Sequence, residues 1–438
     1  MSPAYPVLKN DIYCAKIHSD SGLQVRIRDT TAGKDFKANP TTIQLLELCT
    51  GTKSVDEIVN VLSEQSGESS EDVYESVNTI LNNLQEKGAI TIKSAPSTGD
   101  TLPVKDVKVK YPIESAHIDV TNKCNLSCLH CVNDSGECYP DELTTDEIFS
   151  LIDTLSRMGA HIMTLSGGEP LMHPDFFEIV KYARKAPMTV YVFTNGTLIT
   201  EDTVKTLKKA GIAKFFVSID SITEDIHDTF RGHKGALKKT LASIQLMKEA
   251  HIQVKPCVSV NQMNKNDITH VLQYFKEQHI TDFQLTPVRF SGRGIHNISI
   301  SPEEYYTILV EQFTYLQKEF PEGIVTLYRR EKEKCGIASD SIAIKADGTV
   351  LPCSGCIRDM GVGNIRQVTL EKLWDTDTTL ELIRKMRVED DRECNQCQYH
   401  PYCGGCMAGA FILEREFRWC DLYVCALLRA YNDVVGLV

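Results

Sequence analysis

Residues 119–131 read DVTNKCNLSCLHC, and the cysteines in this stretch decide how the rest of the chain is interpreted. They are Cys124, Cys128 and Cys131, at the spacing C-x3-C-x2-C. Three thiolates from one loop can bind three irons of a cubane cluster and leave the fourth iron open to another ligand. Structural zinc usually takes four protein ligands, and this loop offers three at that spacing. Cys138 could be a fourth ligand, but a cysteine without a ligand role is the simpler interpretation for it.

This cysteine loop follows the first of several hydrophobic stretches that alternate with amphipathic ones between residues 114 and 325. Helices such as TDEIFSLIDTLSRMG and GALKKTLASIQLMKEA are expected between the strands. Six such units predict an α/β fold with a parallel sheet, either open or curled into part of a barrel. Chemistry in such sheets is found at the carboxyl ends of the strands. The expected strands are AHIDVT, HIMTLSG, TVYVFTN, KFFVSID, QVKPCVSV and DFQLTPV.

Composition narrows the class of protein. The 438 residues carry 47 Lys and Arg against 59 Asp and Glu, a formal net charge of −12, which argues against a nucleic-acid partner. No run approaches the roughly 18 apolar residues of a membrane span, and the start MSPAYPVLKND lacks the apolar core of a signal peptide. We therefore expect a cytoplasmic protein without a membrane partner, whose 16 cysteines indicate metal or redox chemistry rather than disulfides.

The flanking regions predict two further domains. Residues 1–95 contain strands over DIYCAKI, LQVRIRD, KDFKANP and AITIK, and three helices that include a capping box from Ser54 to Glu57. This order predicts a winged-helix-like domain, and its acidic helix faces argue against DNA binding. Residues 96–113 are expected to be a linker. Residues 326–438 have little periodicity and nine cysteines, so bound metal is expected to replace a core there.

The segment around Cys124 resembles the signature of radical S-adenosylmethionine (SAM) enzymes, and the resemblance extends over residues 114–325. It implies a partial (β/α)6 barrel of the TIM-like kind. It also implies that Cys124, Cys128 and Cys131 are catalytic and bind a [4Fe–4S] cluster whose open iron chelates SAM. An electron from the cluster then cleaves SAM to methionine and a 5′-deoxyadenosyl radical. The resemblance implies an electron donor such as flavodoxin or ferredoxin.

Further matches follow successive strands. The SGGEP segment at residues 166–170 resembles the GGEP element of the family, in which glycines let the backbone approach a ligand and a carboxylate takes the SAM ammonium. Arg231 resembles the arginine that pairs with the SAM carboxylate. Each element alone would also fit an ordinary turn or a surface charge, so the resemblance depends on the order in which the elements follow successive strands. The residues thereby assigned to SAM are His130, Gly167, Gly168, Glu169, Thr194, Asn195, Ser218, Asp220 and Arg231.

The second group of cysteines runs from Cys335 to Cys425. Its C-x2-C-x5-C-x2-C run would by itself favour zinc, but seven or more ligands exceed one site. The spacing resembles the SPASM extension of radical SAM enzymes, which implies two auxiliary clusters and three [4Fe–4S] clusters in all. By this resemblance, the first auxiliary cluster is held by Cys335, Cys353 and Cys406, and the second by Cys394, Cys397, Cys403 and Cys420.

Two ligand positions stay open at this point. Ser341 stands where a fully ligated first auxiliary cluster has a cysteine, so that cluster either has an open iron or is closed by Cys356. For the second auxiliary cluster, Cys420 is preferred over Cys425 because it lies at about the usual distance after the preceding run.

The N-terminal phrase NPTTIQLLELCTG…SVDEIVNVL…LQEKGAI resembles the peptide-binding, PqqD-like domains of enzymes that mature ribosomally made peptides. Such domains capture a leader peptide as an added strand. The phrase IHDTFRGHKG at residues 226–235 resembles sactipeptide-type maturases, which form thioethers. We therefore expect thioether formation on a precursor peptide. The alternatives are carbon–carbon crosslinking, epimerisation or decarboxylation of a peptide, modification of a tetrapyrrole, and a leader-binding chaperone with structural clusters.

Overall fold

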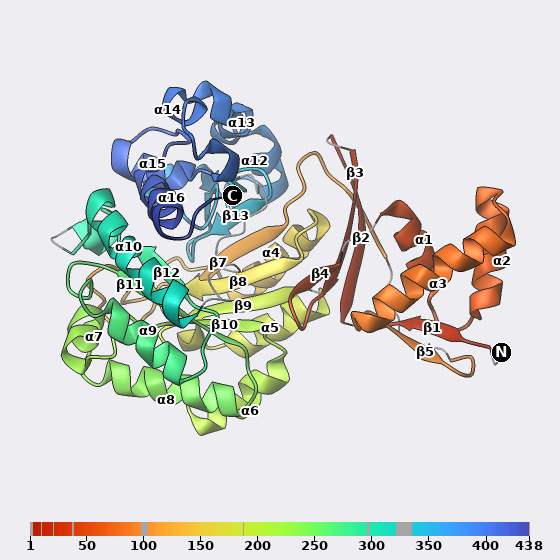
Figure 1. Cartoon of the computed structure of the whole chain (residues 1–438), viewed down its shortest axis with the longest axis horizontal. Coiled ribbons are helices and arrows are strands. Elements are labelled where there is room, and N and C mark those ends of the chain that lie inside the picture. The colour runs from red at the N-terminus through yellow and green to blue at the C-terminus, as the bar shows by residue number, and fades with distance from the viewer. Residues whose placement is uncertain are drawn as a thin grey trace.

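The computed structural model describes residues 3–9, 11–20, 22–36, 39–97, 104–186, 188–295, 298–320 and 335–437. Figure 1 shows a central sheet covered by helices, a small N-terminal domain at one end of it and a helical C-terminal part over its edge.

The central sheet has nine strands in the order β12-β11-β10-β9-β8-β7-β13-β14-β15. Neighbouring strands from β7 to β12 are all parallel, which confirms the predicted fold class and all six predicted strands. Each begins and ends within about two residues of its expected position. The strands are β7 (Ser115–Thr121), β8 (Ile162–Gly167), β9 (Thr189–Thr194), β10 (Lys214–Ser218), β11 (Val254–Val260) and β12 (Gln284–Pro287).

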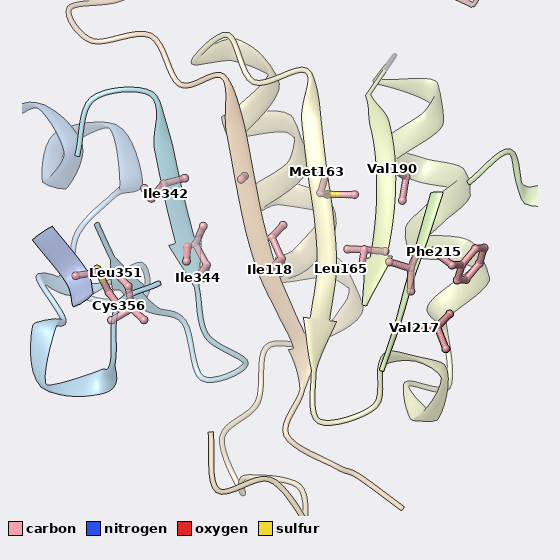
Figure 2. Packing of buried hydrophobic residues seen from close by; sticks show 14 of the residues in the cluster. Ile118, Met163, Leu165, Val190, Phe215, Val217, Ile342, Ile344, Leu351 and Cys356 are labelled. Carbon is pink, nitrogen blue, oxygen red and sulfur yellow. The ribbon is translucent and has the colours of Figure 1, made fainter. Parts of the chain in front are cut away.

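Helices cover the outer face of this sheet because alternate strand residues are apolar. Met163 and Leu165 of β8 are fully buried toward the helices (Figure 2), whereas Thr164 between them lies on the opposite, interior face. Each such buried side chain contributes about 1.5–3 kcal/mol. The helices are α4 (Thr145–Arg157), α5 (Phe176–Lys185), α6 (Glu201–Ala210), α7 (Glu224–Arg231), α8 (Ala236–Glu249), α9 (Ile268–Glu277) and α10 (Pro302–Glu319), with 3-10 turns η1 (Pro170–Met172) and η2 (Gly292–Ile295).

The C-terminal part extends the sheet. Strand β13 (Ser341–Ile344) lies parallel to β7, and its Ile342 and Ile344 enter the main core (Figure 2). The expectation that bound metal replaces a core here is wrong for residues 335–437, where Trp374 is also fully buried. Strand β13 was missed because it lies outside the alternating strand–helix pattern and its partner β7 is far away in the chain. The other elements are β14 (Thr349–Leu351), β15 (Gly363–Asn364), α12 (Leu370–Thr376), α13 (Thr378–Lys385), α14 (Arg392–Asn395), α15 (Met407–Glu414) and α16 (Leu422–Val434), with 3-10 turns η3 (Arg358–Met360), η4 (Val388–Asp390) and η5 (His400–Tyr402).

The N-terminal domain has its own core and the predicted three helices. Part of the expected linker is a strand, β6 (Lys105–Lys108), which pairs in parallel with β2. Its sequence KDVK buries only Val107 well, so it carries no strand pattern. The remaining elements are β1 (Tyr5–Leu8), β2 (Ile12–Ser19), β3 (Gly22–Asp29), β4 (Lys34–Phe36), α1 (Pro40–Leu48), α2 (Val55–Ser66), α3 (Ser70–Glu86) and β5 (Ile90–Lys93).

The N-terminal domain docks on the amino end of the central sheet through Arg28 of β3. The Arg28 side chain is 4% exposed; its Nε donates to Thr189 Oγ1 at 2.9 Å and its Nη2 to Tyr191 Oη at 2.8 Å. Asp35 of β4 pairs with its Nη1. A Cβ atom at Gly33 would lie 2.6 Å from Tyr191 Oη, so this turn needs glycine to approach the sheet. The docking therefore lies at the opposite end from the carboxyl ends of the strands.

Replacing Arg28 by Met should loosen this docking. A hydrogen bond to a charged group contributes about 1.5–3 kcal/mol, so the free energy of local opening should fall by at least about 1.5 kcal/mol. Faster amide hydrogen exchange at β3, β4 and the start of β9 would show it. Arg157→Met, which removes an exposed pair with Glu371, is the matched control and should change nothing. Unaltered exchange in the Arg28 variant would contradict the docking role.

Candidate active site

A cavity of about 450 Å³ lies at the carboxyl ends of the central strands. The loop after β7 contributes Cys124, Cys128 and Cys131 to its wall, and the ends of β8, β9 and β10 contribute further residues. The C-terminal part closes another side with Cys356. Residues far apart in the sequence thus surround one space, as expected for an α/β sheet of this kind.

The three cysteines of the loop are held in polar and charged surroundings. Arg231 Nη1 lies 3.7 Å from Cys128 Sγ, and the Ser135 N–H donates to Cys131 Sγ at 3.3 Å. Burial raises the pKa of Cys124 to about 11, so that free thiol is protonated at neutral pH and metal binding must displace the proton. Donors aimed at sulfur and a nearby guanidinium are what bound thiolates require.

The Ser166–Pro170 turn packs directly against the cysteine loop. Gly168 N donates to Thr121 O, and Glu169 N to Lys123 O, both at 2.8 Å. A Cβ atom at Gly167 or Gly168 would lie 2.1 or 2.3 Å from backbone oxygens of that loop. The two glycines also line the cavity. Glycine is therefore required at both positions chiefly because two backbone segments approach each other closely there.

Glu169 is fully buried and is not among the cavity-lining residues. Its carboxylate accepts hydrogen bonds from Thr194 Oγ1 and Asn195 N, both at 2.8 Å. Burial raises its pKa to about 7, against the opposing effect of these donors. The carboxylate therefore ties the turn after β8 to the turn after β9, and its contact with the SAM ammonium stays a prediction. Thr194 and Asn195 themselves line the cavity.

Arg231 and Asp220 form a buried ion pair beside the cluster loop. Arg231 Nε lies 2.6 Å from Asp220 Oδ2, and Ser259 N donates to Asp220 Oδ1 at 2.9 Å. Burial alone would raise the pKa of Asp220, but Arg231 outweighs it and the pKa is lowered. Arg231 and Ser218 line the cavity, whereas Asp220 supports Arg231 from behind. Pairing of Arg231 with the SAM carboxylate stays a prediction.

His130 forms an uncharged part of the wall. Its ring stacks on Phe230 with centroids 4.3 Å apart. Burial, and secondarily Arg231, lower its pKa to about 3, so the imidazole is neutral. A flat, neutral ring surface of this kind suits the neighbourhood of an aromatic base.

The first auxiliary group gathers around Cys353. Cys353 Sγ lies 3.5 Å from Cys356 Sγ, and the N–H of Met407, next to Cys406, donates to Cys335. Ser341 instead begins β13. Cys356 is the thiol beside Cys353, and it also faces the main cavity.

The second auxiliary group lines a separate cavity of about 260 Å³. Five thiols surround it, one more than a cubane binds. Cys420 Sγ and Cys425 Sγ lie 3.8 Å apart. The Asp391 carboxylate accepts from the N–H groups of Cys394 and Cys420, both at 3.2 Å, and so fixes these two relative to each other. The five thiols are those of Cys394, Cys397, Cys403, Cys420 and Cys425.

The cavity-lining residues that sequence reasoning missed include His117, Asp119 and Lys345. The signal was present in AHIDVT, where His117 and Asp119 alternate with apolar residues and so point into the barrel from the first strand.

Three family models match the chain. The radical SAM superfamily model matches residues 118–275, the iron–sulfur cluster-binding (SPASM) domain 335–398, and coenzyme PQQ synthesis protein D (PqqD) 26–90. The AdoMet-dependent heme synthase of Methanosarcina barkeri is 32% identical over 329 residues, covering 68% of this chain and 92% of the relative. The chain belongs to the radical SAM superfamily.

Two further matches extend over nearly the whole chain. The antilisterial bacteriocin subtilosin biosynthesis protein AlbA of Bacillus subtilis is 26% identical over 414 residues, covering 92% of each chain. The structure of Streptococcus suis SuiB bound to the precursor peptide SuiA has a TM-score of 0.64 and 14% identity, covering 96% of this chain and 99% of that one. The latter shows the shared fold.

Radical SAM and SPASM domains bind SAM and [4Fe–4S] clusters, and the thiols found here fit that donor set. Three come from one loop and face a cavity, and two further groups lie in the C-terminal part. Among the described residues, no three His, Cys, Asp or Glu side chains converge closely enough for a single metal ion. A cubane is larger and holds its ligands further apart. A search of the described helices found none long and apolar enough to span a membrane.

Replacing Cys124, Cys128 and Cys131 together by Ala should abolish 5′-deoxyadenosine formation, because the cluster that would bind SAM loses its three protein ligands. Iron analysis should show loss of one cluster with the auxiliary iron retained. Cys138→Ala removes an exposed thiol next to the same loop and should retain both the iron and SAM cleavage. Continued SAM cleavage by the triple variant would refute the assignment.

Cys420→Ala should cost the second auxiliary cluster more iron than Cys425→Ala, because the backbone of Cys420 is tied to Cys394 through Asp391. The two variants would be compared by their iron content per chain and by electron paramagnetic resonance. Both measurements use protein in which Cys124, Cys128 and Cys131 are also replaced by Ala. The opposite order would assign the ligand position to Cys425.

Proposed function

We propose that this radical SAM enzyme modifies a ribosomally made precursor peptide and joins a cysteine sulfur of that peptide to a carbon atom as a thioether. The N-terminal domain carries this proposal. It matches the PqqD model over residues 26–90, and the AlbA alignment covers 92% of both chains. A peptide-binding domain has no use in an enzyme whose substrate is a free small molecule.

The N-terminal sheet offers an edge for the leader. Its strand order is β4-β3-β2-β6, and β4 pairs with β3 only over Ile27–Asp29. Among the described strands, none pairs with the Gly22–Arg26 half of β3 on that side, where Leu23 is 50% exposed. An extended peptide can add there through backbone hydrogen bonds, with apolar side chains giving specificity.

The chemistry divides between cofactor and protein. Bound SAM, together with an electron from a donor such as flavodoxin or ferredoxin, would supply the radical chemistry needed to remove a hydrogen atom from the peptide carbon. In our proposal the chain positions SAM with the residues assigned above and shields the space from water. Cys356 faces the same cavity, so the first auxiliary cluster would lie beside the reacting peptide and could take up the remaining electron.

Tetrapyrrole modification is the second candidate, because the heme synthase of Methanosarcina barkeri is 32% identical. That match covers 68% of this chain. Tetrapyrrole modification would give the N-terminal domain no function.

Incubation with SAM, a reductant and a cysteine-containing precursor peptide tests the proposal. Mass spectrometry should show the loss of two hydrogens per crosslink and of one alkylatable thiol. The same peptide with Cys replaced by Ser, or without its leader, should stay unmodified. Crosslinking between two carbons would leave the thiol free, and epimerisation would leave the mass unchanged. Turnover of an iron porphyrin with no change in any peptide would favour the second candidate.

A further inference from the structure

A charged group that the SAM-binding assignments do not use lies in the wall of the active cavity. It consists of His117 and Asp119 of β7 and Lys345, which follows β13. Lys345 Nζ lies 2.8 Å from Asp119 Oδ2, and His117 Nε2 lies 3.4 Å from Asp119 Oδ1. β13 pairs with β7, so the Lys345 ammonium reaches the carboxylate from the neighbouring strand.

Asp119 is held as a carboxylate. Burial alone would raise its pKa, but Lys345 first and His117 second outweigh that effect and hold the pKa well below its usual range. Asn133 Nδ2 also donates to Oδ2 at 3.0 Å. Oδ1 is buried and accepts no hydrogen bond of good geometry within the described part of the chain, and His117 Nε2 lies 3.4 Å from it.

The residues beside His117 on the neighbouring strands do not titrate. Its register partners are Thr164 on β8 and Ala343 on β13, and the Phe193 ring of β9 lies 6.1 Å from it, centroid to centroid. Among the described residues, the charged group paired with the imidazole is Asp119, and Lys345 lies beyond it. Nε2 is the ring nitrogen that lies near the carboxylate, at 3.4 Å from Oδ1, so the tautomer that Asp119 favours has its proton on Nε2 and leaves Nδ1 as the proton acceptor. An imidazole oriented by a carboxylate in this way is a common general base.

We propose that His117 is the general base that removes the proton from the peptide cysteine during thioether formation, and that Asp119 and Lys345 are its positioning residues. The inference rests on the proposed function. The reaction breaks one S–H bond and one C–H bond and forms one C–S bond. The hydrogen atom from carbon goes to the deoxyadenosyl radical, the thiol proton goes to His117 Nδ1, and the remaining electron goes to an iron–sulfur cluster.

The first test compares His117→Gln with the wild type and counts crosslinks formed per 5′-deoxyadenosine. A general base contributes about 10²–10⁴-fold, so this ratio should fall at least about tenfold. His270→Gln is the matched control, because it removes another histidine paired with an aspartate, at 3.0 Å, outside the cavity. Added imidazole should restore crosslinking in His117→Ala, which a purely structural role of the ring would not allow.

The second test measures directly which nitrogen of the His117 ring carries a proton, and it does not depend on turnover. In oxidised enzyme labelled with ¹⁵N histidine, the resonances lost in His117→Gln identify His117. They should show a proton on Nε2 and none on Nδ1. Asp119→Asn should remove this tautomer preference. A proton on Nδ1 in the wild type would overturn the proposal.

The outcomes separate this inference from the proposed function. If the wild type forms no thioether with a cysteine-containing precursor, both fail, and the mass spectrum shows it. If the wild type forms the thioether and His117→Gln does so at the same ratio, or imidazole rescues nothing, only the base assignment fails.

Discussion

The active site depends on the close contact between the Gly167–Gly168 turn and the cysteine loop. Two backbone hydrogen bonds join them, and no side chain larger than hydrogen fits at either glycine. Glu169 continues this contact to the turn after β9, so hydrogen bonds join three successive strand ends. Backbone packing therefore contributes to the position of the cysteine loop.

The charged and polar residues of the site fall into two groups, those that support the cavity wall from behind and those that face the cavity. Asp220 and Glu169 lie behind the cavity wall, where each is satisfied by nearby donors. The groups that face the cavity are cationic, neutral or thiol, with Arg231, His130 and the cysteines as examples. Asp119 is the exception, because its carboxylate lies on the cavity side and is paired with Lys345. A cavity with this lining favours an anionic cluster and an anionic carboxylate.

Strong local patterns made much of this predictable from the sequence. The six strands, the cysteine loop and the GGEP turn are each signalled by several adjacent residues. The strands β6 and β13 were missed because each lies outside the predicted strand–helix pattern and pairs with a partner far away in the chain. The 3.5 Å approach of Cys356 Sγ to Cys353 Sγ depends on the turn between them, and the pairing of Asp119 with Lys345 across neighbouring strands has no counterpart in spacing. Long-range pairing, rather than local propensity, limited the prediction.

The docking of Arg28 at the start of β9 has a geometric consequence. The N-terminal domain touches one end of the strands, whereas the cysteine loop lies at the other. β9 has six residues, so the two ends are separated by about 20 Å at roughly 3.3 Å per residue. Any chain held by the domain must cover at least that distance before it enters the cavity, which corresponds to about six extended residues. The scaffold thus sets a minimum spacing between the segment that is recognised and the residue that reacts.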